Sequence, residues 1–452
     1  MPSGDLQGKF TLRHVVSQAG WAGAFELLGT LVRYVLAVLV ARLFGAQGLG
    51  LYTLAIAFAS AAALVSRVGL DRAIMRFTPY HRAQHDLQAV VGVAWAASGI
   101  TAILSLLVAA TLALAAGPIE RTWQLPGLAD GVRIMSLAVP AIALGEVWRY
   151  GLRGFQDVRF AAFLEKLVIP GSAAIIVLAG GMLGFRDARI AIVASAAAYV
   201  LAAMGAGLSL RRAVTSLHAT PRWHLRAWVS FGLFLSLEGG LLYLLHWTDQ
   251  LLVGLFLDAT QVGIYAAAVR VALLTSVPLM AVNTILGPTL AGFHGAGDRE
   301  RLRLTYTRLT WATAAGGVAV GLTLLAIGPF VLSLFGDEFA SGYAALAIVT
   351  LGQMVNAGTG SAGLVLGMTG HVRWRLINAA LAAILNVTLN LLLIPLLGIV
   401  GSGIATAASL VAINLLQIAE VRWLLGFWGY DPRQLAFWID RVRRTRSRSA
   451  TR

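Results

Sequence analysis

The stretch RLFGAQGLGLYTLAIAF, residues 42–58, decides how the chain is organised, because a similar stretch, GLFLDATQVGIYAAAVRV, returns at residues 254–271. The aligned pairs are Phe44 with Phe256, Gly50 with Gly263, and Tyr52 with Tyr265. The offset drifts only from 212 to 214 while the match continues for more than a hundred residues. Chance similarity between apolar segments would not keep register across the loops. We therefore predict an internal repeat.

The composition places both copies of the repeat in a membrane. Of the 452 residues, 58% are hydrophobic and only 12% are charged, and the mean hydropathy is +0.78. A soluble protein carries about 25% charged residues. Because the chain has no cysteine, a disulfide framework and a thiolate site are excluded. The net charge of +15 does not indicate nucleic acid, since the arginines are spread over short loops.

We predict an all-α integral membrane protein with about twelve transmembrane helices, six in each copy. An even number gives both copies the same orientation, so their symmetry axis runs along the membrane normal. Two such lobes, residues 1–218 and 219–428, would enclose a central cleft and precede a basic tail at 429–452. The predicted spans are 15–42, 50–77, 88–116, 131–150, 161–184, 188–210, 228–256, 262–290, 304–335, 341–369, 376–397 and 401–425.

The loops differ in positive charge. The surface that shares the N-terminus holds 25 lysines and arginines, tail included, and the opposite surface holds five. Positive loops stay in the cytoplasm, so both termini are predicted to be cytoplasmic. The arginine run of the tail predicts an anchor on anionic lipid.

The first span carries Glu26 and Arg33, although a charge at bilayer depth costs roughly 2.5–3.5 kcal/mol. At offset 212, Glu26 falls on Glu238, whereas Arg33 falls on Leu245. Each glutamate lies about ten residues, or ~15 Å, from the cytoplasmic end of its span, which is near the midplane. If the repeat holds in space, the two carboxylates face each other across the cleft.

Other ionisable residues within spans have simpler explanations. Arg67 and Asp71 stand at i, i+4 and either neutralise each other or face the cleft. Asp249 lies three turns after Glu238 on one helix face, and Arg270 lies in the eighth span. We interpret Glu146, Arg149, Glu165 and Lys166 as side chains that reach the interface, and the asparagines of the eleventh span, Asn386 and Asn390, as ties between helices.

No enzyme motif is present. GDLQGKFT, residues 4–11, has one residue too few between its glycines for a P-loop and Phe10 where Ser or Thr must hold magnesium. His81 and His85 lie in a basic loop with no nearby cluster of acidic residues that could complete a metal site, so we expect a solvated loop and no metal. The sequence therefore predicts a transporter without ATPase activity and without a cofactor, apart from a coupling proton or sodium ion.

Three stretches resemble the polysaccharide-export and O-antigen repeat-unit flippases of the multidrug/oligosaccharidyl-lipid/polysaccharide (MOP) superfamily. They are residues 41–77, residues 249–271, and INAALAAILNVTLNLLLIPLLGIVGSGIATAASL at 377–410. The resemblance covers nearly the whole chain. It implies a carrier that moves a polyprenyl-pyrophosphate-linked oligosaccharide from the cytoplasmic to the outer face of a prokaryotic plasma membrane. Glycosyltransferases and a glycan polymerase of the same pathway would be its partners.

The resemblance also implies that spans 1, 2, 7 and 8 line the cavity, which gives the candidates Glu26, Arg33, Arg67, Glu238, Asp249 and Arg270. Guanidinium groups grip phosphate oxygens through paired hydrogen bonds, so Arg33 and Arg270 are the candidates for the pyrophosphate. A carboxyl in a low-dielectric cleft holds a proton more readily, so Glu26 and Glu238 are the candidates for the coupling ion. Structural ion pairing is the alternative for all of these residues.

Three other functions stay open. A cation-coupled multidrug exporter would favour an acidic cavity with few arginines. A lipid II flippase is implied less well, because those proteins have an arginine and an aspartate adjacent in the first span and fourteen spans overall, whereas Tyr34 follows Arg33 here. A membrane glycan polymerase would need a sizeable external loop, and the longest predicted one is only about 117–130.

Overall fold

The computed structural model describes residues 12–430, with side chains from residue 24 onward except those at 238, 242, 284, 285, 288 and 372. Every regular element in this range is helical, as predicted. Contacts divide the chain into two compact units. The first holds residues up to Ala268 together with Leu332–Gly342 and Ile394–Ile399, and the second holds the rest. These units reflect contacts and not sequence similarity, so the lobes 1–218 and 219–428 stay a prediction.

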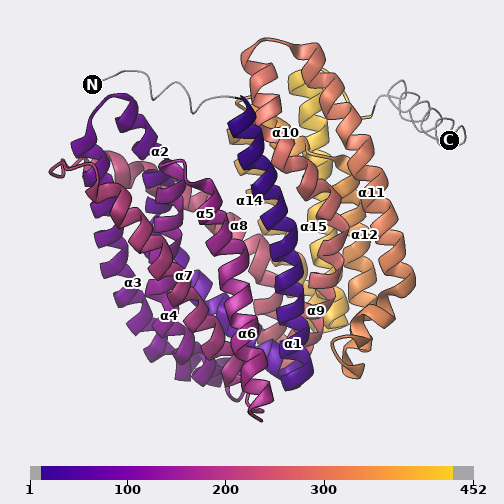
Figure 1. The fold of residues 1–452 in the computed structure, drawn as a ribbon. Helices are drawn as coiled ribbons and strands as arrows, with labels where there is room; N and C mark the ends of the chain where they lie inside the picture. The colour runs from indigo at the N-terminus through magenta and orange to yellow at the C-terminus, as the bar shows by residue number, and fades with distance from the viewer. Residues whose placement is uncertain (1–11, 431–452) are drawn as a thin grey trace, which may run out of the picture. The chain divides into compact units, whose positions relative to one another are not determined.

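The first unit is organised around one helix, α4 (Leu128–Gly154), which packs against five others (Figure 1). Each of two opposite faces of α4 borders a cavity. The other helices of this unit are α1 (Leu12–Arg67), α2 (Leu70–Ala83), α3 (Leu87–Trp123), α5 (Val158–Phe163), α6 (Ile169–Met182), α7 (Arg189–Thr215), α8 (Leu225–Phe256) and most of α9 (Ala259–Ala272). A π-helical segment, Leu164–Val168, joins α5 to α6.

The second unit is also helical. It contains α10 (Val277–Gly295), α12 (Tyr343–Thr359), α13 (Ala362–Met368) and most of α11 (Arg299–Ser333), α14 (Val372–Leu397) and α15 (Ile399–Glu420). Hydrogen bonds between amide and hydroxyl side chains link its helices. The Ser402 hydroxyl on α15 donates to Asn390 Oδ1 on α14 at 2.8 Å, and Asn414 Nδ2 donates to Asn356 Oδ1 at 3.1 Å. Asn390 thus ties two helices, as the sequence predicts.

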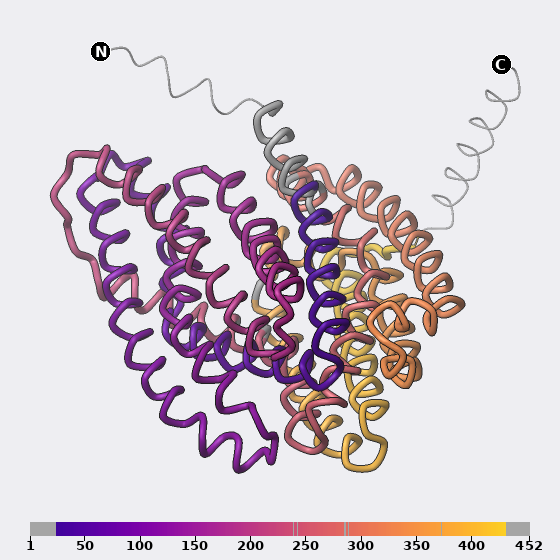
Figure 2. The backbone as a smooth tube through the Cα atoms, turned by 60° about the horizontal axis from the view of Figure 1, so that its bottom comes forward, coloured from indigo at the N-terminus to yellow at the C-terminus, as the bar shows by residue number. Residues whose placement is uncertain are grey.

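Ten helices in the described range are long and apolar enough to cross a membrane, or eleven if the bent pair in α8 is one span. The sequence predicts about twelve. The difference arises at α1, whose candidate span Ala24–Arg67 has 44 residues. This is ~66 Å of helix, about twice the hydrocarbon thickness of a bilayer. Gly45, at φ 69°, breaks it, and α1 changes direction part-way along its length (Figure 2). The first predicted span, 15–42, therefore lies before this break, and the second, 50–77, begins after it and runs past the end of α1 at Arg67 into α2.

The repeated stretch packs against its own second copy. A Cβ on Gly50 would lie 1.8 Å from the Ala259 carbonyl oxygen, and one on Gly263 would lie 1.9 Å from the Ala46 carbonyl oxygen. At offset 213, Ala46 corresponds to Ala259 and Gly50 to Gly263, so each contact is the counterpart of the other. Reciprocal contacts of this kind are typical of a local twofold axis. Ala46 with Gly50, and Ala259 with Gly263, are pairs of small residues four positions apart. Small residues at this spacing let the two helix backbones come into direct contact.

The segment between α7 and α8 packs onto the ends of α2 and α3. The Arg222 amide donates to the Gln88 carbonyl at 3.0 Å, and the Arg222 guanidinium pairs with Asp86 at 3.1 Å. Beside this pair His81 is buried and stacks on His224, with ring centroids 5.9 Å apart. The expectation of a solvated loop is therefore wrong for His81, because it lies inside α2 and this segment covers it.

This histidine makes the stability of the first unit depend on pH. Burial lowers the pKa of His81 below 6.5; Asp86 opposes that shift, and His224 adds to it. With its folded pKa below the unfolded value, His81 stabilises the fold fully above pH 6.5, and this contribution is lost as pH falls through the folded pKa. We expect the melting temperature to fall between pH 7.5 and 5.5, and to fall less for His81→Phe. His294→Phe, at the repeat counterpart of His81, should keep the wild-type pH dependence.

Candidate functional site

A cavity of about 350 Å³ lies within the first unit, between α1, α2, α4, α8 and the π-helical segment. Its wall is rich in charge, which is unusual for side chains at transmembrane depth. The lining residues are Ser60, Leu64, Arg67, Gly69, Asp71, Arg72, Glu146, Tyr150, Glu165, Leu235, Ser236, Gly239, Tyr243 and Trp247.

The break between α1 and α2 brings the first charges together. Val68 and Gly69 both adopt left-handed conformations, at φ 49° and 71°, and end α1 directly after Arg67. A Cβ on Gly69 would lie 1.9 Å from the Gly232 carbonyl oxygen, so only glycine lets α8 approach this turn. Beyond the break, Asp71 accepts a hydrogen bond from the Arg67 guanidinium at 3.1 Å.

The α4 helix supplies the next pair. Arg149 is 1% exposed and pairs with Glu146 at 2.8 Å. Glu146 is also 4.0 Å from Arg67, so it connects the α4 pair to the pair at the α1–α2 break. A buried guanidinium that lost its carboxylate would be left as an uncompensated charge, so Glu146 holds this group in place.

The π-helical segment supplies a third group of charges. Lys166 Nζ pairs with Glu165 at 2.9 Å and with Glu26 on α1 at 2.8 Å. Glu165 pairs in turn with Arg153 of α4 at 2.5 Å. A π turn inserts one residue and rotates the side chains that follow it, and such turns occur frequently at functional sites. Gly29 allows the close packing, since a Cβ there would lie 2.6 Å from the Lys166 carbonyl oxygen.

Tyr150 lies between two guanidinium groups in the cavity wall. Arg153 lies 4.7 Å from the centre of its ring and Arg72 lies 5.0 Å from it, both within cation–π distance. Arg153 has Glu165 as its carboxylate partner, but Arg72 has no ion pair with any carboxylate of the described residues. Arg72 thus lines the cavity without a carboxylate partner among the described side chains.

Among the described side chains, the network has more positive than negative charge, although the cavity wall itself holds two arginines and three carboxylates. Six cations and four carboxylates make it up, and opposite charges in a medium of reduced dielectric attract more strongly than in water. A negatively charged group that enters the cavity would meet Arg72, which has no carboxylate partner among the described side chains. The cations are Arg33, Arg67, Arg72, Arg149, Arg153 and Lys166, and the carboxylates are Glu26, Asp71, Glu146 and Glu165.

The predicted site residues of the first two spans lie in this network. Arg67 lines the cavity. Glu26 joins the network through Lys166 but does not line the cavity, and Arg33 lies 3.5 Å from Glu26.

The other predicted residues lie elsewhere. Asp249 is buried, accepts a hydrogen bond from the Tyr265 hydroxyl at 3.2 Å, and does not line this cavity. Arg270 lies on α9 in the second unit. The side chain of Glu238 and the tail residues 431–452 lie outside the described part of the chain.

Sequence reasoning assigned Glu146, Arg149, Glu165 and Lys166 to the interface, whereas the structure joins them to the charge network. It gave no role to Tyr150 and counted Arg72 and Arg153 only as cytoplasmic loop charges. One signal could have found the α4 members. Glu146, Arg149, Tyr150 and Arg153 recur at i, i+3, i+4 and i+7, which places them on one helix face.

Within the described ranges, no cluster of three or more His, Cys, Asp or Glu side chains could hold a metal ion. The network carboxylates face cations instead.

Two family models match the sequence. One describes a polysaccharide biosynthesis protein and matches residues 15–294, which is more than half of the chain. The other, MatE, matches residues 235–392.

A curated relative is "Probable flippase AglR" of Haloferax volcanii, 25% identical over 177 residues. This match covers 38% of the chain and 37% of the relative. The fold is similar to an inward-facing multidrug resistance MATE family transporter of the MOP superfamily, at a TM-score of 0.71 and 16% identity, over 90% of this chain and 98% of that one. It is also similar to the lipid II flippase MurJ, at a TM-score of 0.72 and 14% identity, over 89% and 87% of the two chains.

Proposed function

Because this chain belongs to the polysaccharide biosynthesis protein family, we propose that it is a flippase for polyprenyl-pyrophosphate-linked oligosaccharides. The substrate would move from the cytoplasmic to the outer face of a prokaryotic plasma membrane by alternating access, with both termini in the cytoplasm. The family match and the MOP fold confirm the predicted resemblance. The identity of the substrate, the direction of its transport and the membrane in which the protein lies are our proposal.

The observation that carries the proposal is Arg72, a guanidinium in the wall of the charged cavity that has no carboxylate partner among the described side chains. A pyrophosphate brings concentrated negative charge, and guanidinium groups bind phosphate oxygens with charge-assisted, paired hydrogen bonds. Arg72 lines the cavity without a carboxylate partner among the side chains that the structure describes, so it is our main candidate for the phosphate contact. Arg33 and Arg270 stay proposed pyrophosphate ligands.

The rest of the cavity suits the remaining chemistry of such a substrate. Carboxylate and hydroxyl oxygens accept hydrogen bonds from sugar hydroxyls, and Glu146, Glu165 and Ser236 offer them in the same wall. Transport would use an ion gradient or the membrane potential, with Glu26 and Glu238 as the proposed coupling residues.

We expect Arg72→Gln to slow translocation of the lipid-linked oligosaccharide at least about tenfold, since a hydrogen bond to a charged group contributes about 1.5–3 kcal/mol. The assay follows exposure of a fluorescent polyprenyl-pyrophosphate oligosaccharide to an outer-face lectin in proteoliposomes. Arg76→Gln is the matched control. Arg76 lies one turn further along α2, packs on Phe231, and does not line the cavity.

Three outcomes separate the alternatives. Loss in Arg72→Gln with full transport in Arg76→Gln supports both the function and the site. Transport by both variants at the wild-type rate would support the function but would show that Arg72 is not part of the substrate site. No transport by the wild type, together with efflux of a cationic dye, would favour a multidrug exporter.

A further inference from the structure

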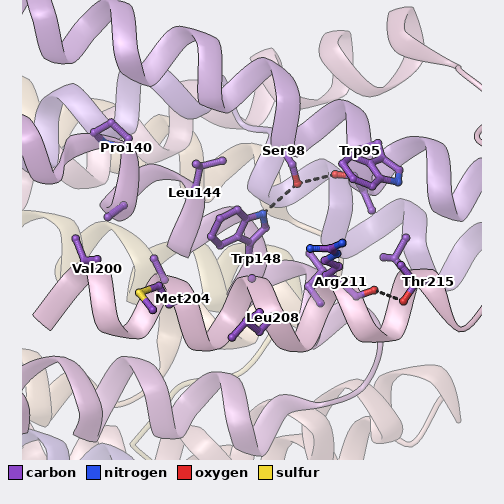
Figure 3. Close-up of a pocket in the computed structure, with 16 residues that line it drawn as sticks. Trp95, Ser98, Pro140, Leu144, Trp148, Val200, Met204, Leu208, Arg211 and Thr215 are labelled. Atoms are coloured by element: carbon purple, nitrogen blue, oxygen red, sulfur yellow. Dashed lines mark hydrogen bonds between the residues drawn. The ribbon is translucent and has the colours of Figure 1, made fainter. Parts of the chain in front are cut away.

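A second cavity, of about 500 Å³, lies on the other face of α4, between α3 and α7 (Figure 3). Leu144 and Trp148 of α4 line it, whereas Glu146 and Tyr150 line the charged cavity. Residues two apart on a helix point in nearly opposite directions, so α4 separates the two spaces. This groove is therefore not part of the proposed substrate site.

The walls of the groove are apolar and open to the outside of the helices. Trp95, Met204 and Leu208 are each more than half exposed. The polar atom of Trp148 is already satisfied, because its indole N–H donates to Ser98 Oγ at 3.0 Å. Gly207 leaves room for that ring, since a Cβ there would lie 2.8 Å from it. An exposed apolar channel on a transmembrane helix faces lipid chains.

One end of the groove carries a positive charge. Arg211 and Thr215 lie there, in the last turns of α7, while Pro140 and Val200 lie at the other end (Figure 3). The Thr215 hydroxyl donates to the Arg211 carbonyl oxygen at 2.9 Å, which leaves the guanidinium as the polar group at this end. Arg211 has no ion pair with a carboxylate of the described residues. The groove thus joins an apolar channel to a cation at the end of a span.

We propose that this groove binds one anionic phospholipid of the membrane. Its acyl chain lies along Trp148, Met204 and Leu208, and its phosphate meets Arg211. Basic residues at the mouth of an apolar pocket between transmembrane helices recognise anionic headgroups in this way. The polyprenyl tail of the transported substrate is the less suitable occupant, because α4 separates the groove from the charged cavity that would hold its pyrophosphate.

The test uses vesicles of phosphatidylcholine and phosphatidylglycerol with a trace of phosphatidylglycerol that carries a photoreactive group in its acyl chain. We expect the wild-type protein to be labelled on α4 and α7 residues of the groove. Arg211→Gln should lower this labelling roughly fivefold, and Arg211→Lys should restore most of it. Arg212→Gln, which removes the neighbouring charge outside the groove, should label as the wild type does.

A second variant fills the groove without changing any charge. Ala141→Phe should abolish labelling there, while Ala110→Phe, on an exposed part of α3 away from the groove, should not. Labelling by photoreactive phosphatidylcholine equal to that by phosphatidylglycerol would overturn the proposal, since the groove would then select no headgroup. Displacement of the label by polyprenyl phosphate, and not by excess phosphatidylglycerol, would also overturn it. Neither readout depends on transport, so the proposed function can fail while this site stands.

Discussion

Gly50→Ala and Gly263→Ala should each lower the apparent melting temperature by at least about 5 °C and reduce the yield of folded protein. A Cβ at either position would lie under 2 Å from a backbone carbonyl oxygen of the other repeat copy. Rotation of a side chain cannot relieve such a clash, so the helices must separate. Overpacking in a close contact costs about 1–3 kcal/mol or more. Thermal unfolding in detergent, followed by size-exclusion chromatography, measures the effect.

Gly99→Ala is the matched control. Gly99 lies inside α3, and nothing is within 4 Å of the position its Cβ would take. Alanine is favoured over glycine in a helix by about 1 kcal/mol, so this variant should be as stable as the wild type or slightly more stable. If Gly50→Ala had the same melting temperature as Gly99→Ala, the proposed close contact between the two repeat copies would be refuted.

Glu146→Ala should be the most destabilising change in the charged cavity. It would remove the carboxylate 2.8 Å from Arg149, a guanidinium that is only 1% exposed. Leaving one partner of a buried ion pair without the other costs about 3–5 kcal/mol, whereas replacing both by apolar residues is often neutral. We therefore expect Glu146→Leu combined with Arg149→Met to regain most of the lost stability. Apparent melting temperatures of the single and double variants measure this coupling.

Asp130→Ala provides the contrast at the surface. Asp130 pairs with Arg189 at 2.6 Å and Arg133 at 3.5 Å, but both arginines are more than half exposed. Exposed ion pairs contribute about 0–1 kcal/mol, so this variant should melt within a few degrees of the wild type. Equal melting of Asp130→Ala and Glu146→Ala would mean that Arg149 is solvated in the cavity.

Much of the fold could be predicted from local sequence. Apolar runs of about twenty residues specify membrane-crossing helices, because the hydrocarbon core requires them. The structure confirms helices at all of the predicted spans. The repeat was also visible, and its glycines at 50 and 263 proved to be contact points. The predicted boundary between the first two spans, at residues 43–49, contains the non-helical Gly45 that divides α1, whereas the break at Val68 and Gly69, inside the predicted span 50–77, was not predicted.

The candidate site could be predicted only in part. Arg67 was found because its charge stands out against an apolar run. Glu165 and Lys166 were misread, because a π-helical turn redirects them and its position depends on packing against Gly29. Nothing in the sequence distinguishes Arg72 from the other loop arginines, because its place next to Tyr150 depends on the packing of α2 against α4.

The sequence by itself determined the membrane class, the helices and the repeat, since these follow from hydropathy and periodicity within one stretch of chain. Only the tertiary structure decided which charges are compensated. Lys166 pairs with Glu26, which lies far earlier in the sequence, whereas Arg72 has no carboxylate partner among the described side chains. It also decided that His81 is buried, since the segment that covers it comes more than a hundred residues later. Electrostatic compensation and burial depend on distances through space, and a local pattern does not contain those distances.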